Sequence, residues 1–160
     1  MFPKTLVEDC HQLLDEGSAE LGMPIGIVSH IFNGDYQIVA INCGNVMMMD
    51  GSVFPLQETY CRDVYKGGKT LAITEIGGVR GMRLHPLYIK LPLEAYISSP
   101  VRHRNLVWGT VNFTSPKTRE PFTEYEIKLV EGLAKRVSEQ LDRLDGPTGY
   151  REASRSRSTV

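Results

Sequence analysis

The residues best suited to chemistry in this chain are its three cysteines, and their positions favour neither a disulfide framework nor a metal site. Cys10, Cys43 and Cys61 are an odd number, lie far apart, and form no Cys-x-x-Cys motif or cluster with histidine. Structural zinc needs such clustered thiolate and imidazole ligands. We therefore expect three reduced thiols.

Other catalytic patterns are missing from the sequence. It contains no Gly-x-Ser-x-Gly, P-loop, His-Glu-x-x-His or paired-carboxylate arrangement. Residues 77–81, Gly-Gly-Val-Arg-Gly, would suit a phosphate cradle, but a mobile loop explains the same glycines more simply. The motifs therefore do not predict an enzyme.

Composition and charge set bounds on size and partners. The 160 residues, 41% hydrophobic and 23% charged, suffice for one domain with its own core. Eighteen basic and nineteen acidic residues leave a net charge of -1, so no global positive field attracts nucleic acid or anionic lipid. The first residues lack signal-peptide features, and no stretch approaches the ~20 apolar residues of a membrane span. We expect a cytoplasmic protein that binds neither nucleic acid nor membrane.

Hydrophobic periodicity predicts two long terminal helices around a set of strands. Apolar residues at three- and four-residue steps indicate an amphipathic helix over residues 4–22. Two β-rich runs, 25–32 and 35–43, flank Asn33-Gly34, the pair that best supports a two-residue hairpin turn. Between this hairpin and the last helix we expect a loop or a frayed strand end over 44–56, a short helix over 57–65, a strand over 70–76 and an irregular segment over 77–94. A second hairpin follows, of 95–101 with 106–113, joined by residues 102–105.

The C-terminal helix has the most specific start signal. Thr123 followed by Glu126 is a capping box, and Phe122 can pack on Ile127 as a hydrophobic staple. Apolar residues then recur like a coiled-coil seam, which serves either the protein's own sheet or a partner helix. From this spacing we predict a homodimer through Ile127, Val130, Ala134, Val137 and Leu141.

The order of the elements predicts an α+β domain in which terminal helices pack on one antiparallel sheet. The composition changes after Asp145, where the chain becomes rich in serine and arginine and almost free of core-forming residues. We therefore expect one domain over residues 1–145 and a disordered tail over residues 146–160.

Given that order, several stretches resemble a GAF domain, the small-ligand sensor module of bacterial signalling proteins. They are Phe-Pro-Leu at 54–56, Thr-Tyr-Cys-Arg-Asp-Val at 59–64, Leu-Ala-Ile-Thr-Glu at 71–75, the run from Leu91 to Val101, the run from Leu106 to Phe113, and Pro-Phe-Thr at 121–123. The resemblance covers about residues 5–144. It implies a central antiparallel sheet with helices from both ends on one face and a ligand pocket on the other, covered by residues 77–94.

The resemblance also implies that the pocket is mostly apolar, with a few convergent polar groups. Seven side chains combine a polar tip with a body that suits such a pocket, and we predict that they bind the ligand: Tyr60, Cys61, Glu75, His85, Tyr88, Tyr96 and Trp108. The alternative for each is a core or surface position with its polar atom satisfied locally. Pockets of this family accept cyclic nucleotides, tetrapyrroles, haem, anions and small metabolites, and no residue here selects among them, so the cofactor stays unknown.

Two chemical variants of the family fit these residues poorly. Around His85 the chain is similar to the phytochrome Cys-His-x-x-Tyr segment that attaches a bilin, but Leu84 stands in the cysteine's place and cannot form the thioether. Some single-domain members reduce free methionine sulfoxide, which needs an attacking thiolate and usually a resolving cysteine. No cysteine of this chain lies in the segment 77–94.

We therefore predict a sensor or regulatory module without catalysis of its own. It would bind a small molecule and pass the change through its terminal helices to a separate output protein. The first alternative is a structural dimerisation module whose pocket is filled by its own side chains. The second, less favoured, is the methionine sulfoxide reductase.

Overall fold

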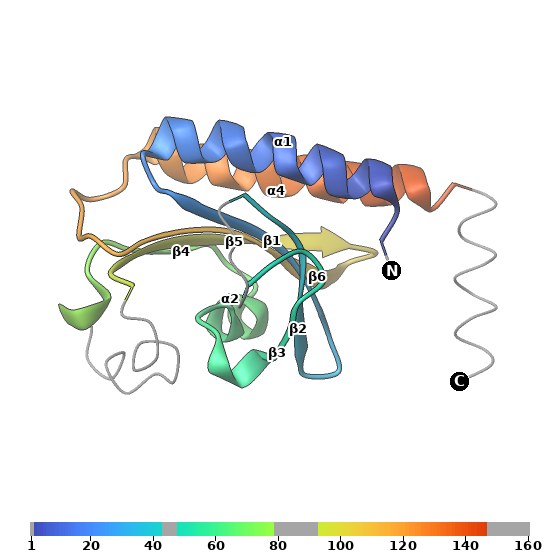
Figure 1. Cartoon of the computed structure of the whole chain (residues 1–160), viewed down its shortest axis with the longest axis horizontal. Helices are drawn as coiled ribbons and strands as arrows, with labels where there is room; N and C mark the ends of the chain where they lie inside the picture. The colour runs from blue at the N-terminus through green and yellow to red at the C-terminus, as the bar shows by residue number, and fades with distance from the viewer. Residues whose placement is uncertain (1, 43–47, 79–92, 147–160) are drawn as a thin grey trace.

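The computed structural model describes residues 2–42, 48–78 and 93–146. In chain order the elements are α1 (Lys4–Leu21), β1 (Ile25–Phe32), β2 (Asp35–Ile41), β3 (Val53–Pro55), the 3-10 turn η1 (Leu56–Glu58), α2 (Cys61–Gly67), β4 (Leu71–Ile73), the 3-10 turn η2 (Ile76–Gly78), β5 (Ala95–His103), β6 (Leu106–Ser115) and α4 (Glu124–Leu144). The strands form a six-stranded antiparallel sheet in the order β3-β2-β1-β6-β5-β4. The long helices α1 and α4 lie side by side on one face of the sheet, and α2 lies on the other (Figure 1). This is the α+β architecture that the sequence predicts.

Side-chain alternation along the strands divides the interior into two cores. On β6, Val111 and Phe113 pack with α1 and α4. The neighbouring Thr110 and Asn112 point to the opposite face, where they meet α2. We call the first the helix-side core and the second the α2-side core. The helix-side core is built from aliphatic, aromatic and thiol groups, whereas the α2-side core also holds hydroxyls and an amide.

Two β-bulges shift this alternation. In β2 the pairing with β1 passes from Ala40 to Ile38 and leaves Val39 as an extra residue. In β6 the pairing with β5 passes from Gly109 to Val107, so Trp108 is the extra residue. A bulge changes which face the following side chains take. As a result Val39 joins the helix-side core, and Trp108 packs against the same core.

The ring of Phe113 sets how closely α1 lies on the sheet. The ring is fully buried, at 0% exposure. A Cβ atom added to Gly17 of α1 would lie 2.3 Å from Phe113 Cζ, and one added to Gly26 of β1 would lie 2.8 Å from Cε1. Contacts that short do not occur between real side chains, so both positions need glycine for the ring to fit.

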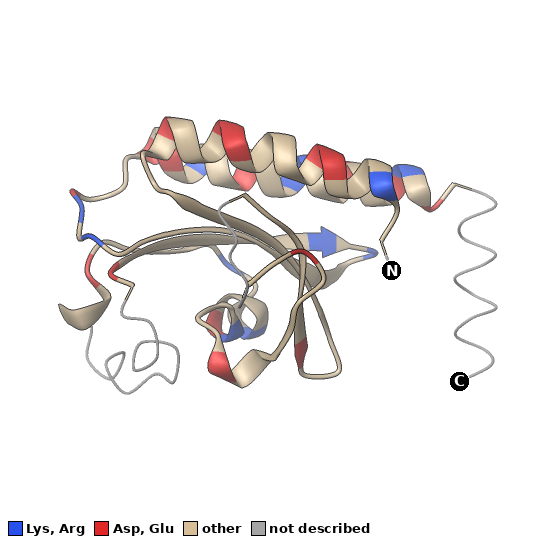
Figure 2. Ribbon diagram, in the orientation of Figure 1, with Lys and Arg blue, Asp and Glu red and all other residues tan. Residues whose placement is uncertain are grey.

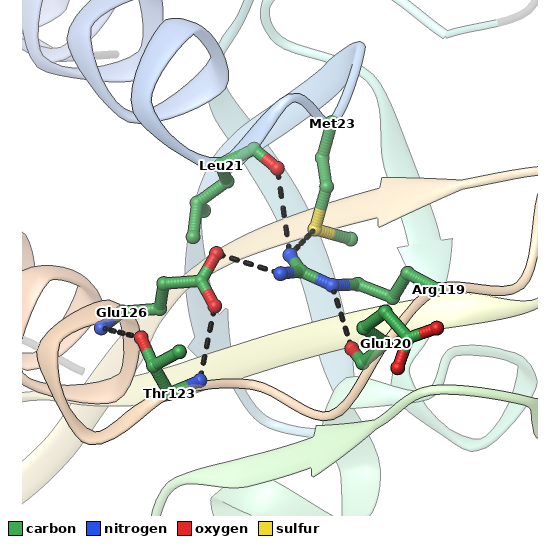
Figure 3. A network of polar contacts seen from close by, with 6 residues as sticks. All are labelled: Leu21, Met23, Arg119, Glu120, Thr123 and Glu126. Atoms are coloured by element: carbon green, nitrogen blue, oxygen red, sulfur yellow. Dashed lines mark hydrogen bonds and ion pairs between the residues drawn. The ribbon is translucent and has the colours of Figure 1, made fainter.

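A polar network joins the end of α1 to the start of α4 (Figure 3). The predicted capping box is present: the Glu126 amide donates to Thr123 Oγ1 at 3.1 Å, and the Thr123 amide donates to Glu126 Oε1 at 3.0 Å. Arg119 Nη2 donates to Glu126 Oε2 at 2.6 Å, and Nη1 donates to the Leu21 carbonyl at 3.4 Å. The Arg119 guanidinium also lies 4.0 Å from the Phe122 ring centroid. Arg119 therefore connects both helices and the loop between β6 and α4.

The apolar seam of α4 packs inside the chain. Its buried members, each 7% exposed or less, are Val130, Ala134, Val137 and Leu141. They belong to the helix-side core, and Ile127 packs half-buried beside it. The homodimer interface predicted through these five residues therefore needs correction, because α1 and the sheet already cover the seam. A homodimer stays a prediction and would use another surface.

The first hairpin and the two long helices follow the sequence prediction closely. Asn33 and Gly34 form the turn between β1 and β2, with φ of 51° and 78°. Gly22 ends α1 with φ of 65°, the left-handed conformation that glycine accepts without strain. In the ranges that the structure covers, no helix has the length and apolar character needed to cross a bilayer.

The segments between the hairpins differ from expectation in detail. The predicted helix over 57–65 is split into η1 and α2, because Thr59 is extended and its hydroxyl donates to the Leu56 carbonyl at 2.9 Å. The predicted strand over 70–76 is the shorter β4 followed by η2. Within 44–56, where a loop or a frayed strand end is predicted, the short strand β3 pairs with β2. The second hairpin turns over Arg104 and Asn105 alone, both at positive φ.

We predict that Gly17→Ala destabilises the protein by ~1–3 kcal/mol, because the added methyl overpacks the site against Phe113. Gly132→Ala is the matched control, since Gly132 also lies within a helix but an added Cβ meets nothing within 4 Å. That control should gain ~0.5–1 kcal/mol from helix propensity. Urea unfolding followed by circular dichroism measures both. Equal stability of the two variants would contradict the close packing described here.

We predict that Glu126 makes the stability of the protein depend on acid pH. Partial burial acts to raise the pKa of its carboxyl, but the hydrogen bonds from Thr123 and Arg119, with the Arg119 charge, hold the pKa below its usual value. A carboxyl whose pKa is lower in the folded state stabilises that state above the unfolded pKa, and the stabilisation is lost as pH falls through the folded pKa. Glu126→Gln keeps an acceptor for the cap but removes the charge, so it should destabilise at pH 7 and less so at about pH 3.

Glu124→Gln is the control for this prediction, because Glu124 lies in the same first turn with its side chain 82% exposed. Urea unfolding at several pH values compares the two variants with the parent chain. If Glu126→Gln followed the parent's pH dependence as closely as Glu124→Gln does, the network would have no electrostatic role.

Candidate ligand-binding site

Cys61, the first residue of α2, points its thiol at the centre of the sheet. The sulfur lies 3.0 Å from the Tyr96 hydroxyl of β5 and accepts a hydrogen bond from Thr110 Oγ1 of β6 at 3.3 Å. The side chain is 2% exposed. The thiol therefore holds the start of α2 against two neighbouring strands.

Further polar groups extend this contact across the sheet. Ser29 Oγ of β1 lies 2.7 Å from Thr110 Oγ1, and the Tyr36 hydroxyl of β2 donates to Asn112 Oδ1 at 3.2 Å. We call the six residues in contact the polar cluster: Ser29, Tyr36, Cys61, Tyr96, Thr110 and Asn112. Each is 3% exposed or less. Four strands and one helix thus converge on one buried hydrogen-bonded group.

Apolar side chains surround the polar cluster. The Tyr60 ring lies 5.5 Å from the Tyr96 ring, edge to face, and branched aliphatic residues such as Ile38 and Ile76 fill the α2-side core around them. Polar tips set in an otherwise apolar surround are the usual composition of a small-molecule site.

The polar cluster is electrically neutral near pH 7. Burial raises the pKa of the Cys61 thiol, and the hydrogen bonds from Thr110 and Tyr96 offset this only in part. Burial also raises the pKa values of Tyr36 and Tyr96 well above the usual value. Throughout the described ranges the buried polar residues are uncharged, and charged residues concentrate on the helices and loops while the central strands carry almost none (Figure 2). The cluster suits neutral hydrogen-bonding chemistry rather than thiolate chemistry or anion binding.

The structure brings together three of the seven predicted site residues. Tyr60, Cys61 and Tyr96 are buried side by side in the α2-side core. Glu75 lies just before η2 in the chain, and it is exposed. His85 and Tyr88 lie outside the described residues.

Trp108 lies apart from the other predicted site residues. As the bulged residue of β6 it packs against the helix-side core instead of facing α2. Its ring stacks on His30 at 4.3 Å and meets the Phe2 ring at 6.0 Å. The His30 Nδ1 lies 2.8 Å from the Trp108 carbonyl, while burial lowers the pKa of His30. The structure therefore does not place Trp108 beside the polar cluster.

Four members of the polar cluster were missed at the level of sequence: Ser29, Tyr36, Thr110 and Asn112. One signal could have found two of them, because β6 reads Thr-Val-Asn-Phe-Thr over residues 110–114. Polar residues at alternate positions usually mark a solvent-facing side. In a central strand that is covered on both faces, they mark a buried polar site instead.

Comparison with known proteins agrees with this geometry. The chain matches the family model described as GAF domain over residues 5–141. No sequence among curated proteins matches the chain.

Solved structures share the fold at low sequence identity. The GAF domain of an Acinetobacter phosphoenolpyruvate-protein phosphotransferase is 12% identical over 87% of this chain and 83% of that chain, with a TM-score of 0.72. A methyl-accepting chemotaxis protein fragment is 13% identical over 88% and 90%, with a TM-score of 0.72. The phycocyanobilin-bound GAF domain from a cyanobacterial phytochrome is 14% identical over 88% and 86%, with a TM-score of 0.70. Identities this low show a common fold and nothing about a shared ligand.

The family model spans most of the chain, and the six-stranded sheet with its terminal helices has the arrangement seen in these neighbours. This protein belongs to the GAF domain family.

Proposed function

We propose that this protein is a regulatory sensor module that binds a small, uncharged molecule on the α2 side of its sheet. GAF domains are typically regulatory modules that sense small ligands, which supports the proposal. Binding would change the arrangement of α1 and α4, which would pass the change to a separate output protein or to a second copy of the chain. The protein has no catalytic role of its own in this proposal.

The observation that carries the proposal is the double contact of β6. Thr110 and Asn112 belong to the polar cluster, while the alternate residues Val111 and Phe113 pack under α1 and α4. The Phe113 ring fits closely against Gly17, so a shift of β6 cannot be absorbed by spare volume on the helix side. A ligand changes the helices in this way only if the two arrangements differ in affinity for it.

The chemistry of the polar cluster selects the class of ligand. Its hydroxyl, thiol and amide groups are neutral, and a charged group placed among them would lose its hydration without gaining an opposite charge. The part of the ligand that meets Tyr60, Cys61 and Tyr96 is therefore uncharged and carries hydroxyl, amide or ring-nitrogen groups. Glu75, His85 and Tyr88 stay predicted contacts on sequence grounds alone. Trp108 is no longer one of them, because its ring packs against the helix-side core.

A second function is favoured by one specific observation. The members of the polar cluster already bond to one another, for example Ser29 to Thr110 and Tyr36 to Asn112. A site whose polar groups satisfy each other can be a filled core, and the protein would then act as a structural module that only assembles with other chains.

Native mass spectrometry of the purified protein, with thermal-shift screening of uncharged metabolites, distinguishes the two functions. The sensor predicts a co-purified mass or a compound that raises Tm. Tyr96→Phe removes the hydroxyl that lies 3.0 Å from the Cys61 sulfur. It should weaken binding of that compound about tenfold or more, because a polar group of the ligand is then left without its hydrogen-bond partner.

Tyr125→Phe is the matched control, since Tyr125 is 66% exposed on α4 and should leave binding unchanged. A bare protein that no uncharged compound stabilises would overturn the sensor and leave the filled structural module.

We also predict that the described cysteines are unreactive in the folded protein. Burial, then Asp9 and Asp50, raises the pKa of Cys10 to about 12, and burial raises the pKa of Cys61. Because the thiolate is the reactive species, iodoacetamide at about pH 8 should alkylate neither residue in buffer and both in denaturant. Peptide mass spectrometry reads each site separately. Rapid alkylation of Cys61 in buffer would reopen the reductase alternative.

A further inference from the structure

The far end of the β5–β6 hairpin contacts α2 on one face of the sheet and α4 on the other. Successive strand residues point to opposite faces. Arg102 Nη2 donates to the carbonyl of Gly68, the residue that caps the C-terminus of α2, at 2.7 Å. The next residue, His103, places Nδ1 3.1 Å from Asp142 Oδ1 and Nε2 2.5 Å from Asp145 Oδ2.

Two more contacts fasten the same hairpin to the end of α4. The Ser138 hydroxyl donates to the backbone carbonyl of Arg102. Arg104 Nη2 lies 2.8 Å from Asp145 Oδ2, the same oxygen that His103 contacts. Three consecutive residues of the hairpin, 102–104, therefore contact both α2 and α4, which lie on opposite faces of the sheet. We call residues 102–104 the hairpin clasp.

The backbone of the hairpin clasp is restrained. Strand pairing continues to its tip, where His103 pairs with Leu106, and the turn consists of Arg104 and Asn105 at φ of 52° and 63°. A two-residue turn of this kind matches the twist of the strands and leaves little slack. Arg102 and His103 therefore move as one unit, so a force on one side chain reaches the other.

We propose that the hairpin clasp is a conformational link that carries a displacement of α2 to the last two turns of α4. The event that would displace α2 is ligand binding at the polar cluster, because α2 begins at Cys61 of that cluster, so this part of the proposal rests on the proposed function. The clasp gives the α2 side a second connection to the terminal helices, separate from β6. It ends at the C-terminal turn of α4.

Hydrogen exchange of the full-length, ligand-free protein tests this link. Arg102→Met keeps the aliphatic stem but removes the bond to α2, and His103→Gln removes the bridge between the two carboxylates of α4. Each variant should speed amide exchange in the helix it touches by roughly three- to tenfold, because a bond to a charged group is lost. The link further predicts an increase of at least about twofold in the helix that the replaced side chain does not contact: residues 139–145 for Arg102→Met, and residues 64–68 for His103→Gln. Ser138 is left out because its hydroxyl bonds to the backbone carbonyl of Arg102.

Arg143→Met is the matched control. It removes a charge and keeps the stem in the same last turn of α4, and Arg143 takes part in none of the hairpin contacts given above, so exchange in α2 should stay as in the parent chain. The link is overturned if each variant loosens only the helix that the replaced side chain contacts. Arg102 is exposed, so Arg102→Met decides the question alone if His103→Gln does not fold. Because the exchange experiment uses no ligand, a negative result rejects the link without affecting the sensor proposal. In the same way, a ligand screen that finds no binder does not affect the link.

Discussion

The close fit of the Phe113 ring between α1 and β1 is the constraint on which the rest of this structure depends. Glycine at 17 and 26 removes two side chains so that one large ring can fill the space. The ring then fixes the spacing of the helix layer from the sheet, and the aliphatic residues of α4 close around it. Such close packing leaves little room for β6 to move without displacing the helices, which is the physical basis of the transmission proposed above.

The other face of β6 is constrained by hydrogen bonding instead of by packing. Hydroxyl, amide and thiol groups are buried there, and leaving one of them unpaired costs ~1–3 kcal/mol. Most have a partner, whereas the buried Thr114 hydroxyl on the same face of β6 has none among the described residues. The contacts among Cys61, Tyr96 and Thr110 provide such pairing without any charge. The β6 strand thus separates a core whose stability depends on close packing from a core whose stability depends on hydrogen-bond pairing.

Sequence reasoning predicted the features that depend on local patterns. The Asn33-Gly34 hairpin, the capping box at Thr123 and the order of the layers all follow from spacing that neighbouring residues determine. It failed where one inserted residue changes a face: the bulge at Trp108 turns that side chain away from α2, and no local signal marks a bulge. The apolar seam of α4 was ambiguous because the same periodicity suits packing on a partner helix and packing on the protein's own sheet. The partners of Cys61 were missed because they come from strands far apart in the chain.

The pairing requirement also limits what a ligand in this site can be. A molecule that enters between α2 and the sheet breaks contacts such as the one between Tyr36 and Asn112, and it must replace each of them with a bond of its own. A hydrocarbon cannot do so, and an ion would need a counter-charge that the polar cluster lacks. The candidates that remain are neutral molecules with both donors and acceptors. The same argument explains why a filled core and a ligand site look alike here, since both favour paired polar groups. The two differ only in whether a ligand replaces the internal hydrogen bonds with its own.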